Sequence, residues 1–181
     1  MIPTSKQAIE LLNVHCVWPH VIAHCKKVAD IAVFLARNLN KNGYKLNISL
    51  VEAGGLLHDI AKPYSIEKHV DHSIEGAKWL EKLGYHEVAE IVKYHVFLPE
   101  TTIKIGEKEI VNYADKRVKD EEIVTLEKRF EYIFKRYGHD KIWKDHLNRL
   151  YDQSKILEET IFRNLPFSPL SLSRILEGES E

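Results

Sequence analysis

The sequence predicts an all-α fold, a helical bundle with a C-terminal helical extension. Apolar residues recur at three- and four-residue steps along most of the chain, which is the spacing of one helix face. Capping residues, prolines and glycines divide these periodic stretches into separate helices. No internal repeat or linker splits the chain, and its 181 residues suffice for one domain with a sizeable core.

The first two helices are predicted from their starting residues. Thr4 or Ser5 can cap a short first helix. Pro19 suits the first turn of a long second helix, because proline lacks the N–H that is unpaired there in any case. The Asn42-Gly43 pair ends that helix. The inward-facing positions of the two helices are Ile9, Leu12, Val21, Val28, Ile31, Ala32 and Leu35.

The third and fourth helices carry the most informative part of the sequence. Asn47 or Ser49 can cap the third, which we expect to close near Pro63. The fourth begins around Asp71-His72 and ends at Gly84. Small and apolar residues dominate their predicted inner faces, namely Val51, Ala53, Leu56, Leu57, Ala77, Leu80 and Leu83.

The fifth helix spans roughly Glu87 to Phe97 and stops before Pro99. Leu98 to Glu109 interrupt the helical pattern with a proline, threonines and a glycine, which indicates a loop or a small hairpin. The inner positions of a sixth helix follow at helical spacing, namely Ile110, Val111, Ala114 and Val118.

Two more helices make up the predicted extension. An amphipathic helix ends near Tyr137-Gly138, and a long one runs from about Lys141 to Arg163. Pro166 and Pro169 break the tail beyond them. We expect a single domain over 1–181, with a core at about 19–119, the extension at about 120–165 and the tail at 166–181.

The composition argues against several classes of protein. A net charge of −1 gives no global electrostatic case for nucleic acid or for an anionic membrane, so we expect neither partner. The longest apolar runs, such as Ile31–Ala36, are far shorter than a membrane span. The N-terminus does not resemble a secretory signal, and Cys16 and Cys25 cannot form a disulfide framework. A reducing cytoplasm is the expected location.

Histidine and aspartate residues at intervals along the helices predict a metal centre. His58 and Asp59 stand side by side after an apolar run. Imidazole and carboxylate ligands without thiolate suit iron, manganese, zinc, nickel or magnesium. On a helix, neighbouring residues project about 100° apart, so the pair could grip one ion or bridge two. The candidate ligands are His24, His58, Asp59, His72, His95 and Asp115.

Simpler roles compete for some of these residues. His72 could cap its helix, and His95 could be a buried histidine bonded to the main chain. His69 is a rival to His72. His20 lies four residues before His24 and shares its helix face, so it could contact substrate or sit at the core edge.

These residues resemble the HD superfamily of metal-dependent phosphohydrolases. The similarity runs from about Val21 to Val118. It is closest to the compact bacterial HDIG-type branch, which includes symmetrical diadenosine-tetraphosphate hydrolases. Ala61 replaces the glycine of the His-Asp-Ile-Gly motif, and nothing beyond Lys119 matches a family motif. His95 lacks the adjacent histidine and the Gly-Tyr-Pro signature of cyclic-di-GMP phosphodiesterases, which disfavours that substrate.

The resemblance implies a catalytic arrangement. One divalent ion would be held by His24, His58, Asp59 and Asp115, and a second by Asp59, His72 and His95. Whether one or two ions bind is left open, as is their identity among Fe, Mn, Zn, Ni and Mg. A water activated by the metal would attack the phosphorus. Asp59 and Lys62 are the candidate catalytic residues.

The predicted substrate is a small phosphate compound of nucleotide type. Lys62 falls one helical turn after His58 and could neutralise phosphate charge, as could Lys116 and Arg117. Two alternatives remain: a mixed-valent di-iron oxygenase, since some HD proteins have similar ligand shells, and a nucleotide-sensing domain without turnover. A homo-oligomer is left open.

Overall fold

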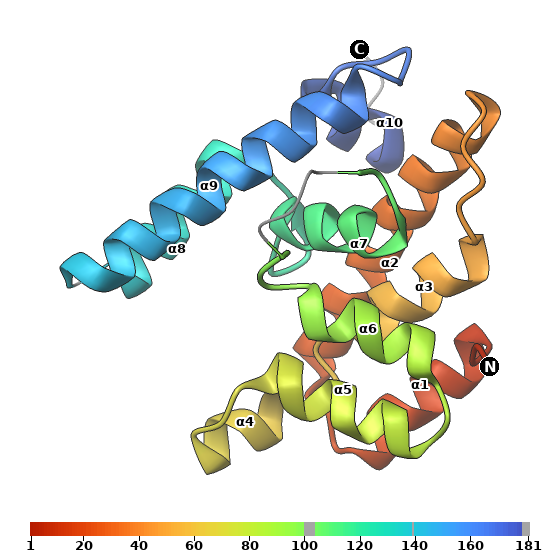
Figure 1. Ribbon diagram of the computed structural model, residues 1–181, viewed down its shortest axis with the longest axis vertical. Helices are drawn as coiled ribbons and strands as arrows, with labels where there is room; N and C mark the ends of the chain where they lie inside the picture. Colours follow the sequence, from red (N-terminus) through yellow and green to blue (C-terminus); the bar gives the residue numbers. More distant parts are fainter. Residues whose placement is uncertain (100–103, 139, 179–181) are drawn as a thin grey trace.

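The computed structural model describes residues 1–99, 104–138 and 140–178, and it confirms the all-α prediction (Figure 1). A single two-stranded hairpin interrupts the helices of this described part. In chain order the elements are α1 (Ser5–Val14), α2 (Pro19–Lys41), α3 (Ile48–Leu57), α4 (Lys62–Lys68), α5 (His72–Lys82), α6 (His86–Tyr94), α7 (Glu107–Lys116), β1 (Val118–Lys119), β2 (Glu122–Ile123), α8 (Leu126–Tyr137), α9 (Lys141–Phe162), the 3₁₀ turn η1 (Pro169–Ser171) and α10 (Leu172–Glu177).

Most predicted helix starts are confirmed because local side chains satisfy the free N–H groups there. Thr4 and Gln7 form a reciprocal capping box at α1. The side chain of Asn47 accepts a hydrogen bond from the main-chain N–H of Leu50 at 3.2 Å and caps α3. The carboxylate of Asp71 caps α5.

The third helix ends earlier than predicted. It stops at Leu57, and His58 to Ala61 form a turn before α4 begins at Lys62. Pro63 lies in the first turn of α4, where proline is tolerated, so it opens a new helix instead of closing the old one. The prediction that Lys62 continues the helix face of His58 was therefore wrong.

The core of the body is built around α2, α3 and α7. These three helices pack against one another, and α6 packs on α3 and α5 on α6 (Figure 1). Helices α2 and α3 approach closely at Gly55, where an added Cβ would lie 2.7 Å from the Cα of Ala29. A side chain at position 55 would push the two helices apart, so glycine permits the contact.

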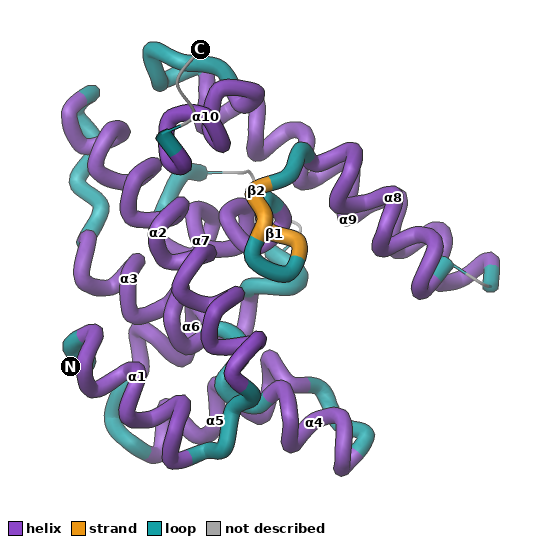
Figure 2. The backbone as a smooth tube through the Cα atoms, turned by 180° about the vertical axis from the view of Figure 1, so that it is seen from behind, coloured by secondary structure: helices purple, strands orange, loops and turns teal. Residues whose placement is uncertain are grey.

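A helical arm projects from this body. Helices α8 and α9 lie side by side and extend away together, with Phe130 against Tyr151 at 5.0 Å between ring centroids (Figure 1). The unpredicted hairpin β1–β2 lies where the arm leaves the body, and Asp120 takes a positive φ of 56° in its turn (Figure 2). Helix α10 was not predicted either. The expected loop from Leu98 to Glu109 overlaps α7 at its end, and its residues 100–103 lie outside the described part.

Candidate metal centre

The six candidate ligands come together from five places in the fold. Each lies at or near a helix end, or on a helix that faces the centre of the body. His24 is on α2, His58 and Asp59 follow α3, His72 begins α5, His95 follows α6, and Asp115 is near the end of α7. Helix packing thus collects side chains that are far apart in the sequence.

Main-chain carbonyls fix three of the imidazole rings. The Nδ1 atoms of His24, His58 and His95 donate hydrogen bonds to the carbonyl oxygens of Asp120 (3.0 Å), Gly55 (2.8 Å) and Val92 (2.6 Å). A carbonyl can only accept, so each Nδ1 carries the proton and leaves Nε2 with a free lone pair. This arrangement is typical of histidines that bind metals.

One group of possible ligands contains His24, His58 and Asp115. The Oδ1 atom of Asp115 lies 3.2 Å from Nε2 of His24 and 3.6 Å from Nε2 of His58. The Nε2 atom of His58 is buried and has no hydrogen-bond partner among the described residues. A buried acceptor facing a carboxylate is costly unless a cation satisfies both, so the residues fit a metal ion.

A second group contains His58, Asp59 and His95, with His72 beside it. The Oδ1 atom of Asp59 lies 3.1 Å from Nε2 of His72 and 3.7 Å from Nε2 of His95. The two histidine Nε2 atoms are 3.1 Å apart. Asp59 therefore stands between the two groups, which is where a bridging carboxylate is needed.

Burial and nearby charge set the ionisation of these ligands. Burial lowers the pKa of His58 to about 3 and also lowers the pKa of His95. Burial raises the pKa of Asp59, but the charges of His58 and Lys62 and the hydrogen bonds from His72 and His95 outweigh it and hold that pKa well below its usual value. The result is a charged carboxylate at Asp59 with neutral imidazoles at His58 and His95, the protonation states that metal binding requires.

His24 differs from the other buried histidines. Burial lowers its pKa, but the hydrogen bond that His24 donates to Asp115 and the nearby carboxylate charges outweigh this effect and raise it. The pKa of Asp115 shifts in the opposite direction, since the hydrogen bond that it accepts from His24 and the charge of Lys116 overcome burial and lower this pKa well below normal. The pair is therefore strongly coupled through the 3.2 Å contact.

Lys62 lies at the edge of this centre. Its Nζ is 3.4 Å from Oδ1 of Asp59, and its side chain is 35% exposed. It can therefore contact both the carboxylate and an incoming anion. His20 is exposed on α2 and stacks on Trp18 at 5.6 Å between ring centroids, and the structure gives it no contact with the six ligands.

Lys116 and Arg117 are placed differently from the predicted substrate contacts. Both are buried. The Nζ atom of Lys116 donates to the carbonyl oxygens of His95 and Asn112 at 2.7 and 3.2 Å. Burial lowers its pKa to about 8. It therefore supports the main chain behind the centre.

Arg117 belongs to a buried structural network. Its guanidinium contacts Tyr113 and Glu158 and donates to the carbonyl oxygens of Val124 at 2.6 Å and Pro169 at 2.9 Å. With 2% of its surface exposed, it has no access to a substrate. The prediction that Arg117 contacts the substrate does not agree with this placement.

The contribution of the β1–β2 hairpin to the candidate metal centre could not be predicted from the sequence. The carbonyl of Asp120 orients His24, but a main-chain acceptor leaves no residue-type signal. The positive φ of Asp120 could not be predicted from the sequence either. A glycine at this position would have indicated such a conformation, but an aspartate, which also tolerates it, does not.

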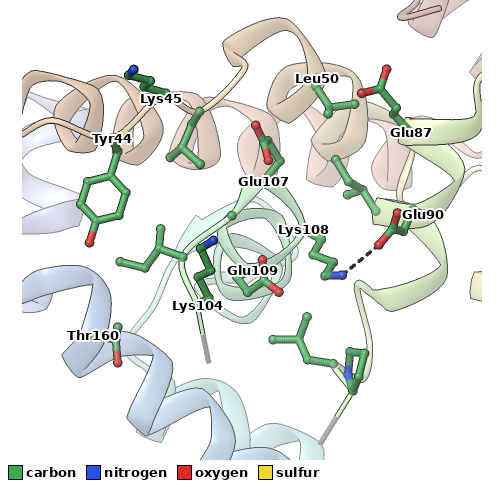
Figure 3. Close-up of a pocket in the computed structure, with 16 residues that line it drawn as sticks. Tyr44, Lys45, Leu50, Glu87, Glu90, Lys104, Glu107, Lys108, Glu109 and Thr160 are labelled. Carbon is green, nitrogen blue, oxygen red and sulfur yellow. Dashed lines mark hydrogen bonds and ion pairs between the residues drawn. The ribbon is translucent and has the colours of Figure 1, made fainter. Parts of the chain in front are cut away.

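A cavity of about 1040 Å³ lies away from the metal centre (Figure 3). Helices α6 and α7 and the segment between α2 and α3 contribute its walls, and none of the six candidate ligands lines it. Its lining mixes both charges, and Lys108 is already paired with Glu90 at 2.9 Å. This cavity is therefore separate from the candidate metal centre.

Comparison with known proteins gives a consistent result. The family model described as the HD domain matches residues 21–137. The chain is 32% identical to an uncharacterized protein of Methanocaldococcus jannaschii over 144 residues, which are 70% of this chain and 83% of that protein. No solved structure gives a significant match.

Two further relatives are longer than this chain. It is 30% identical to a tRNA (cytidine(56)-2'-O)-methyltransferase of Thermoplasma volcanium over 68% of its own length and 41% of the relative. It is also 30% identical to ribonuclease Y of Fervidobacterium nodosum, over 66% of its length and 25% of that protein.

Within the described residues, no helix combines the length and apolar character needed to cross a bilayer.

Proposed function

This chain is a member of the HD domain family, and on that basis we propose that it is a metal-dependent phosphohydrolase. It would cleave a phosphate ester or anhydride of a nucleotide-type substrate, with water as the nucleophile. The buried Nε2 of His58, which faces two carboxylates without a hydrogen-bond partner, is the observation that carries the proposal.

Two groups of residues would hold the metal. His24, His58 and Asp115 would bind one divalent ion, and Asp59, His72 and His95 a second, with Asp59 as the bridging carboxylate. Iron and manganese suit this donor set best, and zinc, nickel or magnesium are compatible with it. A divalent cation supplies charge that lowers the pKa of water and neutralises phosphate oxygens.

The protein side chains have defined tasks in this reaction. The carbonyl-bound imidazoles of His24, His58 and His95 hold their Nε2 atoms in place, so the site needs little rearrangement. Asp59 contributes negative charge at the middle of the centre. Lys62, beside Asp59 and partly exposed, would bind an oxygen of the scissile phosphate.

The substrate class is proposed from chemistry and from the relatives. Ribonuclease Y and the tRNA methyltransferase carry names that refer to RNA, whereas the sequence resembles diadenosine-tetraphosphate hydrolases. A phosphate in a nucleotide-type compound is common to both. The free cysteines Cys16 and Cys25 fit a reducing cytoplasm as the proposed location.

A substrate screen with purified protein tests this function. The protein is prepared without oxygen, loaded separately with Mn²⁺, Fe²⁺ or Zn²⁺, and assayed with p-nitrophenyl phosphate, mononucleotides, dinucleoside polyphosphates and oligoribonucleotides. We expect phosphate release or strand cleavage under anaerobic conditions. Elemental analysis of the same samples gives the number of bound ions.

The Asp59→Ala variant is the matched negative control. Because Asp59 is buried and contacts ligands of both groups, its loss should abolish turnover and strongly reduce metal content. Asp152→Ala, a change at an exposed position on α9, should leave both unchanged. Wild-type metal content in Asp59→Ala would contradict the assignment. Oxygen consumption that requires iron, or tight nucleotide binding without turnover, would replace the hydrolase proposal.

A further inference from the structure

Three cationic side chains surround one tyrosine ring at the root of the arm. Lys119 of the hairpin and Arg129 of α8 lie over the ring of Tyr132, with 5.2 and 5.8 Å to its centroid. Arg136 donates from Nη1 to the hydroxyl of Tyr132 at 2.6 Å. We call Lys119, Arg129, Tyr132 and Arg136 the Tyr132 cluster.

The positive charge of this cluster is not balanced by the protein. Within the described residues, none of its three cations forms an ion pair with a carboxylate. Lys128, by contrast, lies on the same helix and pairs with Glu122 at 4.0 Å. Cations held close together without counter-charge repel one another, and an anion bound among them relieves that repulsion.

Arg129 is the member with an unused buried donor. Its Nε–H is buried and has no hydrogen-bond partner among the described residues. Leaving such a donor unpaired is unfavourable, and more so when the group is charged. The planar guanidinium presents donors in the geometry that matches phosphate oxygens.

The cluster adjoins the proposed metal centre. Lys119 directly precedes Asp120, whose carbonyl accepts the hydrogen bond from His24. Lys119 and Arg129 lie over the same ring of Tyr132, so contacts run from Arg129 through Tyr132 to the hairpin that orients His24. The hairpin therefore links the cluster to His24, a member of the first group of candidate ligands.

We propose that Arg129 binds a second phosphate of the substrate, next to the phosphate that is cleaved. This inference rests on the proposed function and adds a substrate class to it. The preferred substrates are those with neighbouring phosphates, as in nucleoside and dinucleoside polyphosphates or in an oligonucleotide strand. Lys119 and Arg136 strengthen the local positive charge, and Tyr132 holds all three cations in position.

Turnover of substrates with one or more phosphates provides the first test. The Mn²⁺-loaded protein is assayed with p-nitrophenyl phosphate, a dinucleoside polyphosphate and a short oligoribonucleotide. Arg129→Ala should lower kcat/KM about 10- to 100-fold for substrates with neighbouring phosphates, the usual effect of losing a charge-assisted contact. The same variant should leave kcat/KM for p-nitrophenyl phosphate within about twofold of wild type. Comparing the dinucleoside polyphosphate with the oligoribonucleotide shows whether the neighbouring phosphates belong to a small molecule or to an RNA strand.

Binding provides a second test that does not require turnover. Calorimetry with AMP and ADP, at equal Mn²⁺ in cell and syringe, compares one phosphate with two. Arg129→Ala should weaken ADP binding about 10-fold or more and leave AMP binding unchanged. Arg129→Lys should recover part of the loss, because it keeps the charge but not the paired donors. Arg149→Ala on α9, at an exposed position, is the matched arginine control.

The outcomes separate this inference from the function on which it rests. Equal losses for AMP and ADP, or no loss for either, would overturn the role of Arg129 even if the enzyme is active. If Arg129→Ala selectively loses ADP binding but the wild-type protein shows no turnover, the phosphate-binding role of Arg129 would stand and the proposed hydrolase function would be wrong. Thermal unfolding of each variant checks folding, and little destabilisation is expected because the buried Nε of Arg129 has no hydrogen-bond partner among the described residues.

Discussion

Single hydrogen bonds to carbonyl oxygens decide which atoms of the centre can bind a metal. The Nδ1–H groups of His24, His58 and His95 all donate hydrogen bonds to main-chain carbonyl oxygens. Their Nε2 atoms are thereby directed at Asp59 and Asp115. The candidate ligand atoms are therefore held in place by the protein itself, which would reduce the ordering cost of binding a metal.

A substitution at Lys62 tests its part in phosphate binding. We expect Lys62→Ala to lower kcat/KM about 10-fold by removing a charge-assisted contact, with metal content unchanged. Activity assays and elemental analysis measure the two effects. Lys82→Ala on α5, at an exposed position, is the control. Unchanged kcat/KM in Lys62→Ala would reduce Lys62 to a surface ion pair with Asp59.

The sequence indicated the candidate ligands but not the surroundings of the neighbouring cations. A set of histidines and aspartates spread over several predicted helices is unusual enough to suggest a metal site before any fold is known. Lys116 and Arg117, by contrast, follow Asp115 in sequence, and nothing local shows that they point into the core. The partner of Arg117 is Glu158, which is 41 residues away and is brought near only by α9.

At the scale of elements, the ends of the helices matter more than their middles. Capping residues made most starts predictable, since Thr4, Asn47 and Asp71 bond within their own first turns. The end of α3 was predicted too late, because Pro63 can close one helix or open the next. The early end places His58 and Asp59 in a turn, where two adjacent side chains can face the same centre.

The β1–β2 hairpin is expected to act on the metal through Asp120. Asp120 has φ 56°, which β-branched residues adopt only with strain. Asp120→Val should therefore distort the turn, misplace the carbonyl that orients His24, and weaken metal binding about 10-fold. Metal titration measures the affinity. Asp120→Gly, which suits the conformation, should keep wild-type affinity, and equal losses in both variants would exclude an effect through the main chain.

The contact of α2 with α3 is expected to be intolerant of added volume. An alanine Cβ at Gly55 would meet the main chain of Ala29 at 2.7 Å, and main chain cannot move without shifting a helix. Gly55→Ala should destabilise the protein by about 1–3 kcal/mol in urea unfolding. The matched variant Gly54→Ala meets the side chain of Ile91, which can rotate, so its cost should be smaller. The reverse order would contradict the packing argument.

At the scale of the whole molecule, buried ionisable groups make folding depend on pH. The unfolded chain protonates His58 near pH 6.5, but the folded protein does so only near its lowered pKa of about 3. The unfolded state therefore binds more protons between these values, and stability falls as pH falls. His95 has the same sign. His24 has the opposite sign, since its raised pKa gives stability that is lost as pH rises above about 6.5.

This linkage predicts a steep loss of stability in mild acid. In metal-free protein, the unfolding free energy should fall by at least about 1.4 kcal/mol per pH unit between roughly pH 6 and 4. The contribution of Asp59 and Asp115, whose pKa values are lowered, is lost only below about pH 3.8. Urea unfolding at several pH values measures the slope. His58→Asn should lower this slope by the amount that corresponds to about one proton, whereas His146→Asn at an exposed position should leave the slope unchanged.

The free nitrogen of His58 belongs to both groups of candidate ligands, yet it holds a single lone pair. Two cations cannot use it at once, so a second ion would bind through Asp59, His72 and His95 without it. We expect occupancy to proceed in two unequal steps, the first ion bound with the buried His58 and the second with the partly exposed His72. A stoichiometric titration with Mn²⁺ would resolve them as separate affinities, and the weaker step would set how much metal the cell must supply for full activity.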